Sequence, residues 1–315
     1  MKLEESISKI ISETVKKKNA EKELTEEEIQ AIIDTYINYV NTKGLNKFST
    51  SLRNALIQNM PEMLVEHRDI QEAFEQRLQE RWKKALNLYD TCVVIGREAG
   101  ELFNKEHRPQ AAKDNDLVFE VIMRIHVRAC QTVSAIGILL KSGYARDALA
   151  RQRTLHELAV TASFIKEHGS ETAKRYWEHN VIESCKIVKE HERYCERLGQ
   201  TPYEPAYIEQ LHLRKAAFID KYGKIFDDQY GWAAHALGKE KGRVQFREIQ
   251  EDTKLDHLHP YYKMASHGVH ANIKGLLFDI GDAYKEKLGY NKAFLAGASD
   301  AGLADPGQLA LISFN

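Results

Sequence analysis

Paired cysteines, proline and net charge are all scarce in this 315-residue chain, and each shortage excludes a class of protein. The four cysteines (Cys92, Cys130, Cys185 and Cys195) show no Cys-x-x-Cys spacing, which argues against a disulfide framework or zinc knuckle and predicts reduced, buried thiols. The formal net charge of −1 supplies no general positive field, so nucleic acid is not the expected partner, although a local basic groove stays open.

Long uninterrupted hydrophobic runs are absent as well. The longest apolar stretch, residues 117–140, contains Arg124, His126 and Arg128, so it does not have the pattern of a membrane span. The first residues are amphipathic and charged rather than typical of a signal peptide. We therefore expect a cytoplasmic protein with no membrane segment.

Only six prolines occur, and strand-like alternation is missing, whereas helical periodicity is present almost everywhere. The prediction is an all-α, multi-helix bundle with an N-terminal helical extension. We expect an N-terminal helical region at 1–106, a bundle domain at 107–290 and a tail at 291–315. The polar, proline-bearing segment 107–116 is the predicted boundary. The tail is either loosely attached or docked through residues 309–314.

The most unusual residue placement lies between Gly143 and Gly169. On a helix, the polar residues Arg146, Arg153 and Glu157 fall on one stripe with Leu149, Val160 and Phe164. The last strong helix, predicted from about 260 to 288, repeats this feature, with Tyr262, Ser266 and His270 on one stripe. Charged groups are seldom buried unless paired, so the two stripes are predicted to face each other.

Two interpretations of this polar cluster stay open. In the structural one, the Arg153–Glu157 pair locks helices together, with His270 and Ser266 bonded to it. In the functional one, His270, Glu157 and Ser266 are the catalytic candidates, and His270 acts as an acid or base. Arg153, Arg146 and Tyr262 would then bind a small anionic or phosphate-bearing ligand.

Two further hypotheses are weaker. His267 and His270, with His257 and His259 upstream, could hold a metal, but no His-Glu-x-x-His motif is present, and neither a metal site nor a cofactor is predicted. Arg151 and His156 have the spacing of the motif in HEPN ribonuclease-type toxins. Five residues turn a helix through about 140°, however, so these two side chains would point in different directions.

Two stretches of the sequence, taken together, resemble the motifs of a known family. GYARDALARQRTLHELAV and YYKMASHGVHANIKG, with Trp232 in the loop before the second, are similar to a bacterial domain-of-unknown-function family numbered 5677. The resemblance covers about residues 110–285. It implies a helical domain, a bacterial or phage source, and characteristic positions at Arg153, Glu157, Ser266 and His270, but it implies no activity.

The leading functional hypothesis is a site that binds or hydrolyses a small phosphate-bearing ligand, with a stress or antiphage role. The alternative is a non-catalytic interaction module, or a homo-oligomer assembled through the helix at 62–103, whose polar cluster is structural. A HEPN-like ribonuclease toxin is the second alternative.

Overall fold

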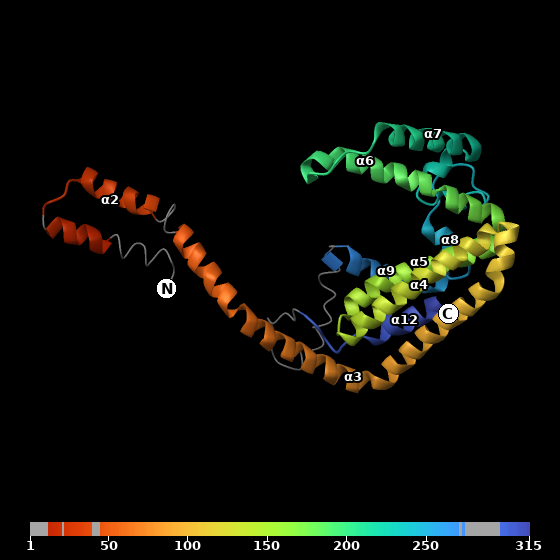
Figure 1. Ribbon diagram of the computed structural model, residues 1–315, viewed down its shortest axis with the longest axis horizontal. Helices are drawn as coiled ribbons and strands as arrows, with labels where there is room; N and C mark the ends of the chain where they lie inside the picture. The colour runs from red at the N-terminus through yellow and green to blue at the C-terminus, as the bar shows by residue number, and fades with distance from the viewer. Residues whose placement is uncertain (1–11, 21, 40–44, 271–272, 275–296) are drawn as a thin grey trace. The chain divides into compact units, whose positions relative to one another are not determined.

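The computed structural model describes residues 12–20, 22–39, 45–270, 273–274 and 297–315 (Figure 1). These residues form helices, turns and loops with no strand among them, so the all-α prediction is confirmed. They divide into two compact units, Met1–Phe74 and Glu75–Asn315. None of the helices in these described ranges has the length and hydropathy needed to cross a membrane.

The first unit contains helix α2, Glu26–Tyr39, which starts with the local bonding that its sequence predicts. The amide of Thr25 donates to Oε2 of Glu28 at 2.9 Å, and the amide of Glu28 donates to Oγ1 of Thr25 at 3.3 Å. This reciprocal pair satisfies two backbone donors that the first helical turn leaves without partners.

Helix α3, Leu45–Asp114, is longer than predicted. It extends beyond the predicted helix at 62–103 at both ends, through Pro61 on one side and through Pro109 in the expected boundary segment 107–116 on the other. Each proline removes one helical hydrogen bond, and the helix-forming residues on both sides compensate for that loss. The chain reverses instead at Asn115, which adopts a left-handed backbone (φ 52°), and Asp116 then caps the next helix by accepting from the amide of Phe119 at 3.0 Å.

Helices α4 (Leu117–Lys141) and α5 (Ala145–Glu178) form the centre of the second unit. The tight turn between them contains Gly143 with φ 80°, so the two helices lie antiparallel. Their shared interface is apolar and includes Val133, Ile136, Leu155 and Val160, all buried completely. Helix α5 kinks at Gly169, whose φ of 72° and ψ of −154° interrupt the helical backbone.

The remaining helices are α6 (Asn180–Leu198), α7 (Pro205–Tyr222), α8 (Phe246–Asp252), α9 (His259–Val269) and α12 (Ala304–Phe314), with short 3-10 helices η2 (Lys224–Asp227), η3 (Gly231–Ala233) and η4 (Asp256–Leu258). Of these, α8, α9 and α12 pack against α5, whereas α6 and α7 pack mainly against each other. Helix α12 packs against α4 and α5 through buried Leu309 and Ala310, so the end of the predicted tail is docked. The predicted helix from 260 to 288 is seen as far as Val269; residues 275–288 lie outside the described ranges.

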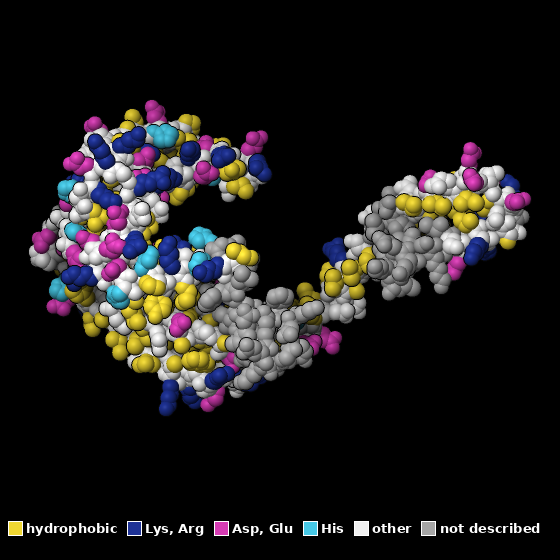
Figure 2. All heavy atoms as spheres, turned by 180° about the vertical axis from the view of Figure 1, so that it is seen from behind, with side chains coloured by type: hydrophobic (Ala, Val, Ile, Leu, Met, Phe, Trp, Pro, Cys, Tyr) yellow, Lys and Arg dark blue, Asp and Glu magenta, His cyan; other side chains and the backbone are white. Residues whose placement is uncertain are grey.

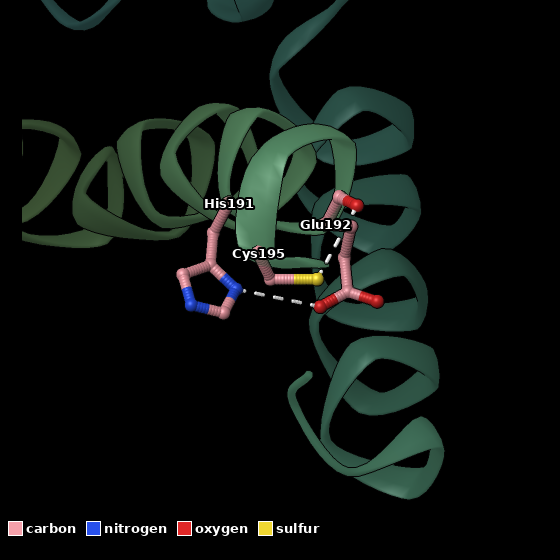
Figure 3. A group of neighbouring side chains, drawn as sticks. All are labelled: His191, Glu192 and Cys195. Carbon is pink, nitrogen blue, oxygen red and sulfur yellow. Dashed lines mark hydrogen bonds and ion pairs between the residues drawn. The ribbon is translucent and has the colours of Figure 1, made fainter. Parts of the chain in front are cut away.

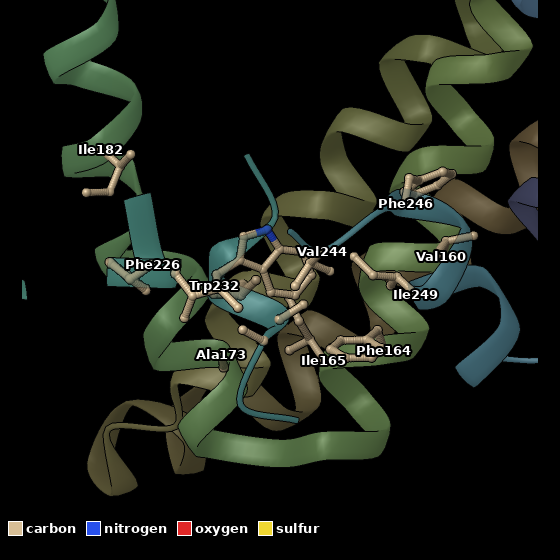
Figure 4. Packing of buried hydrophobic residues seen from close by; sticks show 14 of the residues in the cluster. Val160, Phe164, Ile165, Ala173, Ile182, Phe226, Trp232, Val244, Phe246 and Ile249 are labelled. Atoms are coloured by element: carbon tan, nitrogen blue, oxygen red, sulfur yellow. The ribbon is translucent and has the colours of Figure 1, made fainter. Parts of the chain in front are cut away.

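Trp232 anchors the loop between α7 and α8 in the main hydrophobic core (Figure 4). Its ring is 4% exposed and meets Phe164 and Tyr176 edge-to-face, at centroid distances of 5.7 and 4.9 Å. Gly231 permits this packing, because a β-carbon there would collide with the carbonyl oxygen of Ile225. The core thereby fixes the position of α8 and the chain leading into α9, which carries half of the polar cluster.

Candidate functional site

A guanidinium, a carboxylate and a phenol connect α5 to α9, and we call these three residues, Arg153, Glu157 and Tyr262, the polar clamp. The Nε of Arg153 donates to Oε1 of Glu157 at 3.2 Å, and its Nη2 donates to the Tyr262 hydroxyl at 3.0 Å. That hydroxyl donates in turn to Oε1 of Glu157 at 2.8 Å. The guanidinium also lies over the Tyr262 ring, 4.8 Å from its centroid. Part of each predicted stripe, Arg153 and Glu157 on α5 and Tyr262 on α9, thus lies together at these distances.

Helix geometry explains why the clamp forms. Arg153 and Glu157 are four residues apart and therefore project from the same face of α5. Helix α9 can approach that face because it presents small residues, Ala265 and Gly268, of which Ala265 is fully buried. A β-carbon at Gly268 would lie 3.7 Å from the carbonyl oxygen of Arg146 on α5, which shows how near the two backbones are.

The clamp keeps its phenol protonated. Burial raises the pKa of Tyr262, and the charge of Glu157 raises it further, whereas Arg153 opposes this shift. Burial likewise raises the pKa of the neighbouring Tyr230, with the charge of Glu157 adding to the effect. The Arg153 guanidinium is desolvated, but Tyr262 and Glu157 more than offset this and raise its pKa. Tyr262 is therefore a neutral donor between two charged groups and not a base.

A second polar chain runs beside the clamp and ends at His156, which the sequence suggested only as half of a HEPN-type pair. Nδ1 of His259 lies 2.8 Å from Oε1 of Gln250, and Nε2 of Gln250 lies 2.7 Å from Nε2 of His156. Gln250 is fully buried and His156 is 1% exposed. Desolvation, with repulsion from His257 and His259, lowers the pKa of His156 to about 4, so this imidazole is neutral near pH ~7. It therefore accepts the amide proton of Gln250.

Basic side chains line a pocket between α5 and α9, which we call the basic pocket. Its volume is about 310 Å³. Its lining comprises Arg146, Leu149, Pro260, Lys263, Met264, His267, Gly268 and Lys274. Four of these residues carry or can carry a positive charge, and no carboxylate is among the described lining residues. Of the predicted ligand-binding residues, Arg146 lines this pocket, whereas Arg153 and Tyr262 belong to the clamp.

Two predicted catalytic residues lie apart from the clamp bonds. The hydroxyl of Ser266 donates to the carbonyl oxygen of Tyr262 one helical turn earlier, at 2.8 Å. His270 is exposed and follows the end of α9, with an extended backbone (φ −103°, ψ 136°). The expectation that His270 faces inward on the Tyr262 stripe is therefore wrong, because the helical turn that would carry it there has ended at Val269.

The metal hypothesis and the HEPN-type hypothesis both depend on where particular histidines lie. Neither His267 nor His270 belongs to a group of three potential metal ligands among the residues that the structure describes. Arg151 and His156 lie on an uninterrupted part of α5, and His156 is enclosed in the core, bonded to Gln250. A HEPN-type pairing of these two residues would require both to face one open site, which this burial does not provide.

The second unit is thus a helical domain with a polar clamp and an adjacent basic pocket, and comparison with known proteins places it in a family. Residues 119–287 match the model described as "Family of unknown function (DUF5677)". The match covers more than half of the chain, so the chain belongs to this family, as its two motifs predicted. No curated protein and no solved structure matches the chain.

The sequence did not identify Gln250 or Lys263, and it suggested His259 only as a possible metal ligand. No sequence pattern pointed to Gln250, because its role depends on its hydrogen bond to His156, a residue of α5 more than 90 positions earlier in the chain. Lys263 and His267 did carry a signal, because they are four residues apart on α9 and thus share a face. That face is adjacent to the Tyr262 stripe and borders the basic pocket.

We predict that Tyr262→Phe lowers the free energy of unfolding by about 1–2 kcal/mol, because Arg153 and Glu157 each lose a hydrogen-bond partner in a partly buried place. Urea denaturation measures this. Tyr261→Phe, on the exposed side of the same helix turn, is the control and should change stability by less than about 0.5 kcal/mol. Equal midpoints for wild type and Tyr262→Phe would contradict the clamp.

Stability should also depend on pH through His156. Above the unfolded pKa of 6.5, both states are neutral; between 6.5 and about 4, only the unfolded chain takes up the proton. The free energy of unfolding therefore falls as the pH drops through this window, by about 2 kcal/mol between roughly pH 7 and pH 5. Urea titrations at both pH values should show that His156→Gln loses this part of the slope, whereas the exposed-site variant His107→Gln keeps it. An unchanged slope in His156→Gln would refute this assignment.

Proposed function

We propose that this protein binds a small phosphate-bearing anion in the basic pocket between α5 and α9. The observation that carries the proposal is the lining of that pocket, where Arg146, Lys263, His267 and Lys274 surround a space of about 310 Å³. Arginine and lysine are the side chains that proteins use most for phosphate oxygens, one as a planar fork and the other as a point charge.

The clamp supports this function indirectly. Glu157 is the carboxylate of the α5 stripe, and its Oε1 accepts from both Arg153 and Tyr262. Its negative charge is thereby neutralised away from the pocket lining. The bonds also hold α9 against α5, which keeps Lys263 and His267 opposite Arg146. In this proposal the clamp is structural, and the cations beside it bind the ligand.

The size and chemistry of the pocket limit the ligand. A volume of about 310 Å³ is at the lower end of the range for ligand pockets, which suits inorganic phosphate, pyrophosphate or the phosphate end of a nucleotide. Leu149, Pro260 and Met264 add apolar walls. In a hydrolytic reaction, half-buried His267 is the lining residue that would act as the general acid or base. Such a ligand is what a nucleotide- or RNA-directed stress or antiphage role would require.

The test is calorimetric titration with inorganic pyrophosphate at low salt. We expect binding to wild type, and we expect Lys263→Gln to weaken it about tenfold or more, because one charge-assisted hydrogen bond is lost. Higher salt should weaken binding as well. A parallel assay of nucleotide and RNA hydrolysis, with His267→Gln, tests for turnover.

Lys174→Gln is the matched control, since Lys174 is an exposed lysine elsewhere on α5 and its replacement removes the same charge. Its affinity for pyrophosphate should equal that of wild type. No binding to wild type, or an equal loss in both lysine variants, would show that the basic pocket is not the site.

We propose self-association through α3 as a second function, within the helix at 62–103 that the sequence indicated. Leu88, Ile95 and Leu102 are seven residues apart and are 61, 59 and 67% exposed. Cys92 and Ala99 lie between them, which gives the alternating four- and three-residue spacing of a coiled-coil seam. Figure 2 shows hydrophobic side chains gathered on the surface of the second unit.

This seam is additional to the face that α3 already buries. Leu86, Tyr89 and Val93 point into the core of the second unit, and the Tyr89 hydroxyl donates to the carbonyl oxygen of Val133 at 2.8 Å. Helix α3 is therefore apolar on two sides. A second copy of the same seam is the partner that fits it, because identical heptad stripes are complementary to each other.

Light scattering during size-exclusion chromatography tests this. Wild type should elute with the mass of a dimer, and Ile95→Lys should shift it towards the monomer, because a charge is then buried in the seam. Ile138→Lys, at an isoleucine of α4 that is 67% exposed, is the control and should remain dimeric. A monomeric wild type at all concentrations would refute the seam.

A further inference from the structure

Three different potential metal ligands lie together near the end of α6: His191, Glu192 and Cys195 (Figure 3). One ligand atom from each side chain, a ring nitrogen, a carboxylate oxygen and the sulfur, lies within 4.8 Å of the other two. These residues are separate from the clamp and the basic pocket, which are formed by α5 and α9.

The sequence spacing explains this grouping. His191 and Cys195 are four residues apart, so they project from one face of α6, and Glu192 follows His191 directly. His191 and Cys195 have the same i, i+4 spacing as the two histidine ligands of the helical zinc motif His-Glu-x-x-His, whereas Glu192, whose counterpart in that motif is a base, is here placed as a third ligand. A search for the all-histidine motif does not detect it.

The surroundings hold the ligand atoms in place. Cys195 is 6% exposed. Oε1 of Glu192 accepts a hydrogen bond from the amide of Tyr203 at 3.0 Å, which fixes the carboxylate. Nδ1 of His191 is buried and makes no hydrogen bond; it faces Oε1 of Glu192 at 3.5 Å (Figure 3). The Tyr203 ring lies 4.6 Å from the imidazole ring and limits its rotation.

We propose that His191, Glu192 and Cys195 bind a zinc ion. A thiolate with an imidazole selects a borderline-soft metal such as Zn²⁺ over Mg²⁺ or Ca²⁺, which prefer oxygen ligands. Zinc bonds of about 2.0–2.3 Å in a tetrahedral site require ligand atoms roughly 3.3–3.6 Å apart. The ligand atoms now lie within 4.8 Å of one another, so binding would draw them closer together.

Binding has a defined proton balance and an entry path. The Cys195 thiol loses its proton to solvent as the sulfur–zinc bond forms, so one proton is released per ion. Three protein ligands leave the fourth position for water. Glu192 also lines a pocket of about 720 Å³ between α6 and α7, which provides access from solvent.

Titration of the full chain with Co²⁺, followed by its absorption spectrum, tests the site. We expect one equivalent to give the intense thiolate-to-cobalt charge-transfer band and the visible bands of a tetrahedral ion, and Zn²⁺ to displace it. Cys195→Ser should abolish the charge-transfer band, and His191→Gln should weaken Co²⁺ binding at least tenfold (an order-of-magnitude value for a lost ligand).

Cys185→Ser is the matched control, because Cys185 is a buried cysteine of the same helix outside the cluster. It should bind Co²⁺ as wild type does. The proposal is overturned if wild type gives no thiolate band, or if the band survives in Cys195→Ser. It is also overturned if His191→Gln binds Co²⁺ as tightly as wild type, a result that does not depend on the folding of Cys195→Ser.

Discussion

The bond set between Arg153, Tyr262 and Glu157 is the interaction on which the rest of the candidate site depends. Helix α9 has eleven residues, and Ala265 is its only buried side chain. So small an apolar contact cannot hold a short helix by itself, since ordering each residue costs on the order of 1–2 kcal/mol of conformational entropy. The polar clamp supplies the missing, directional attachment to α5.

The polar clamp keeps the negative charge of Glu157 apart from the positive charges of the basic pocket. Glu157 is paired inside the clamp, whereas Arg146, Lys263 and His267 border the pocket. Because a buried charge is stable only with a partner, the arginine and the glutamate must occur together, and their four-residue spacing ensures that they do. The family match at 119–287 includes both α5 and α9, so the clamp and all the lining residues of the basic pocket fall within the family domain.

Much of this arrangement was predictable because it follows from helical periodicity. The stripe of Arg153 and Glu157 and the stripe that contains Tyr262 came from counting residues on two helices. The position of His270 could not be predicted in this way, because the periodic pattern of the sequence continues past Val269, whereas helix α9 ends there. Gln250 could not be predicted either: its bond to His156 exists only once α8 packs against α5. The continuation of α3 through Pro61 was not predictable from the sequence pattern either. The helix propensity of the neighbouring residues outweighs the unfavourable contribution of one proline.

A double-mutant cycle of Arg153→Met and Tyr262→Phe, read as the free energy of unfolding in urea, tests the clamp most directly. The two residues lie on different helices and are in contact at 3.0 Å. If the clamp holds α9 on α5, the double variant should be less destabilised than the sum of the single variants, with a coupling of about 0.5–3 kcal/mol. Strictly additive effects would contradict it, because they would mean that the two side chains stabilise the protein independently.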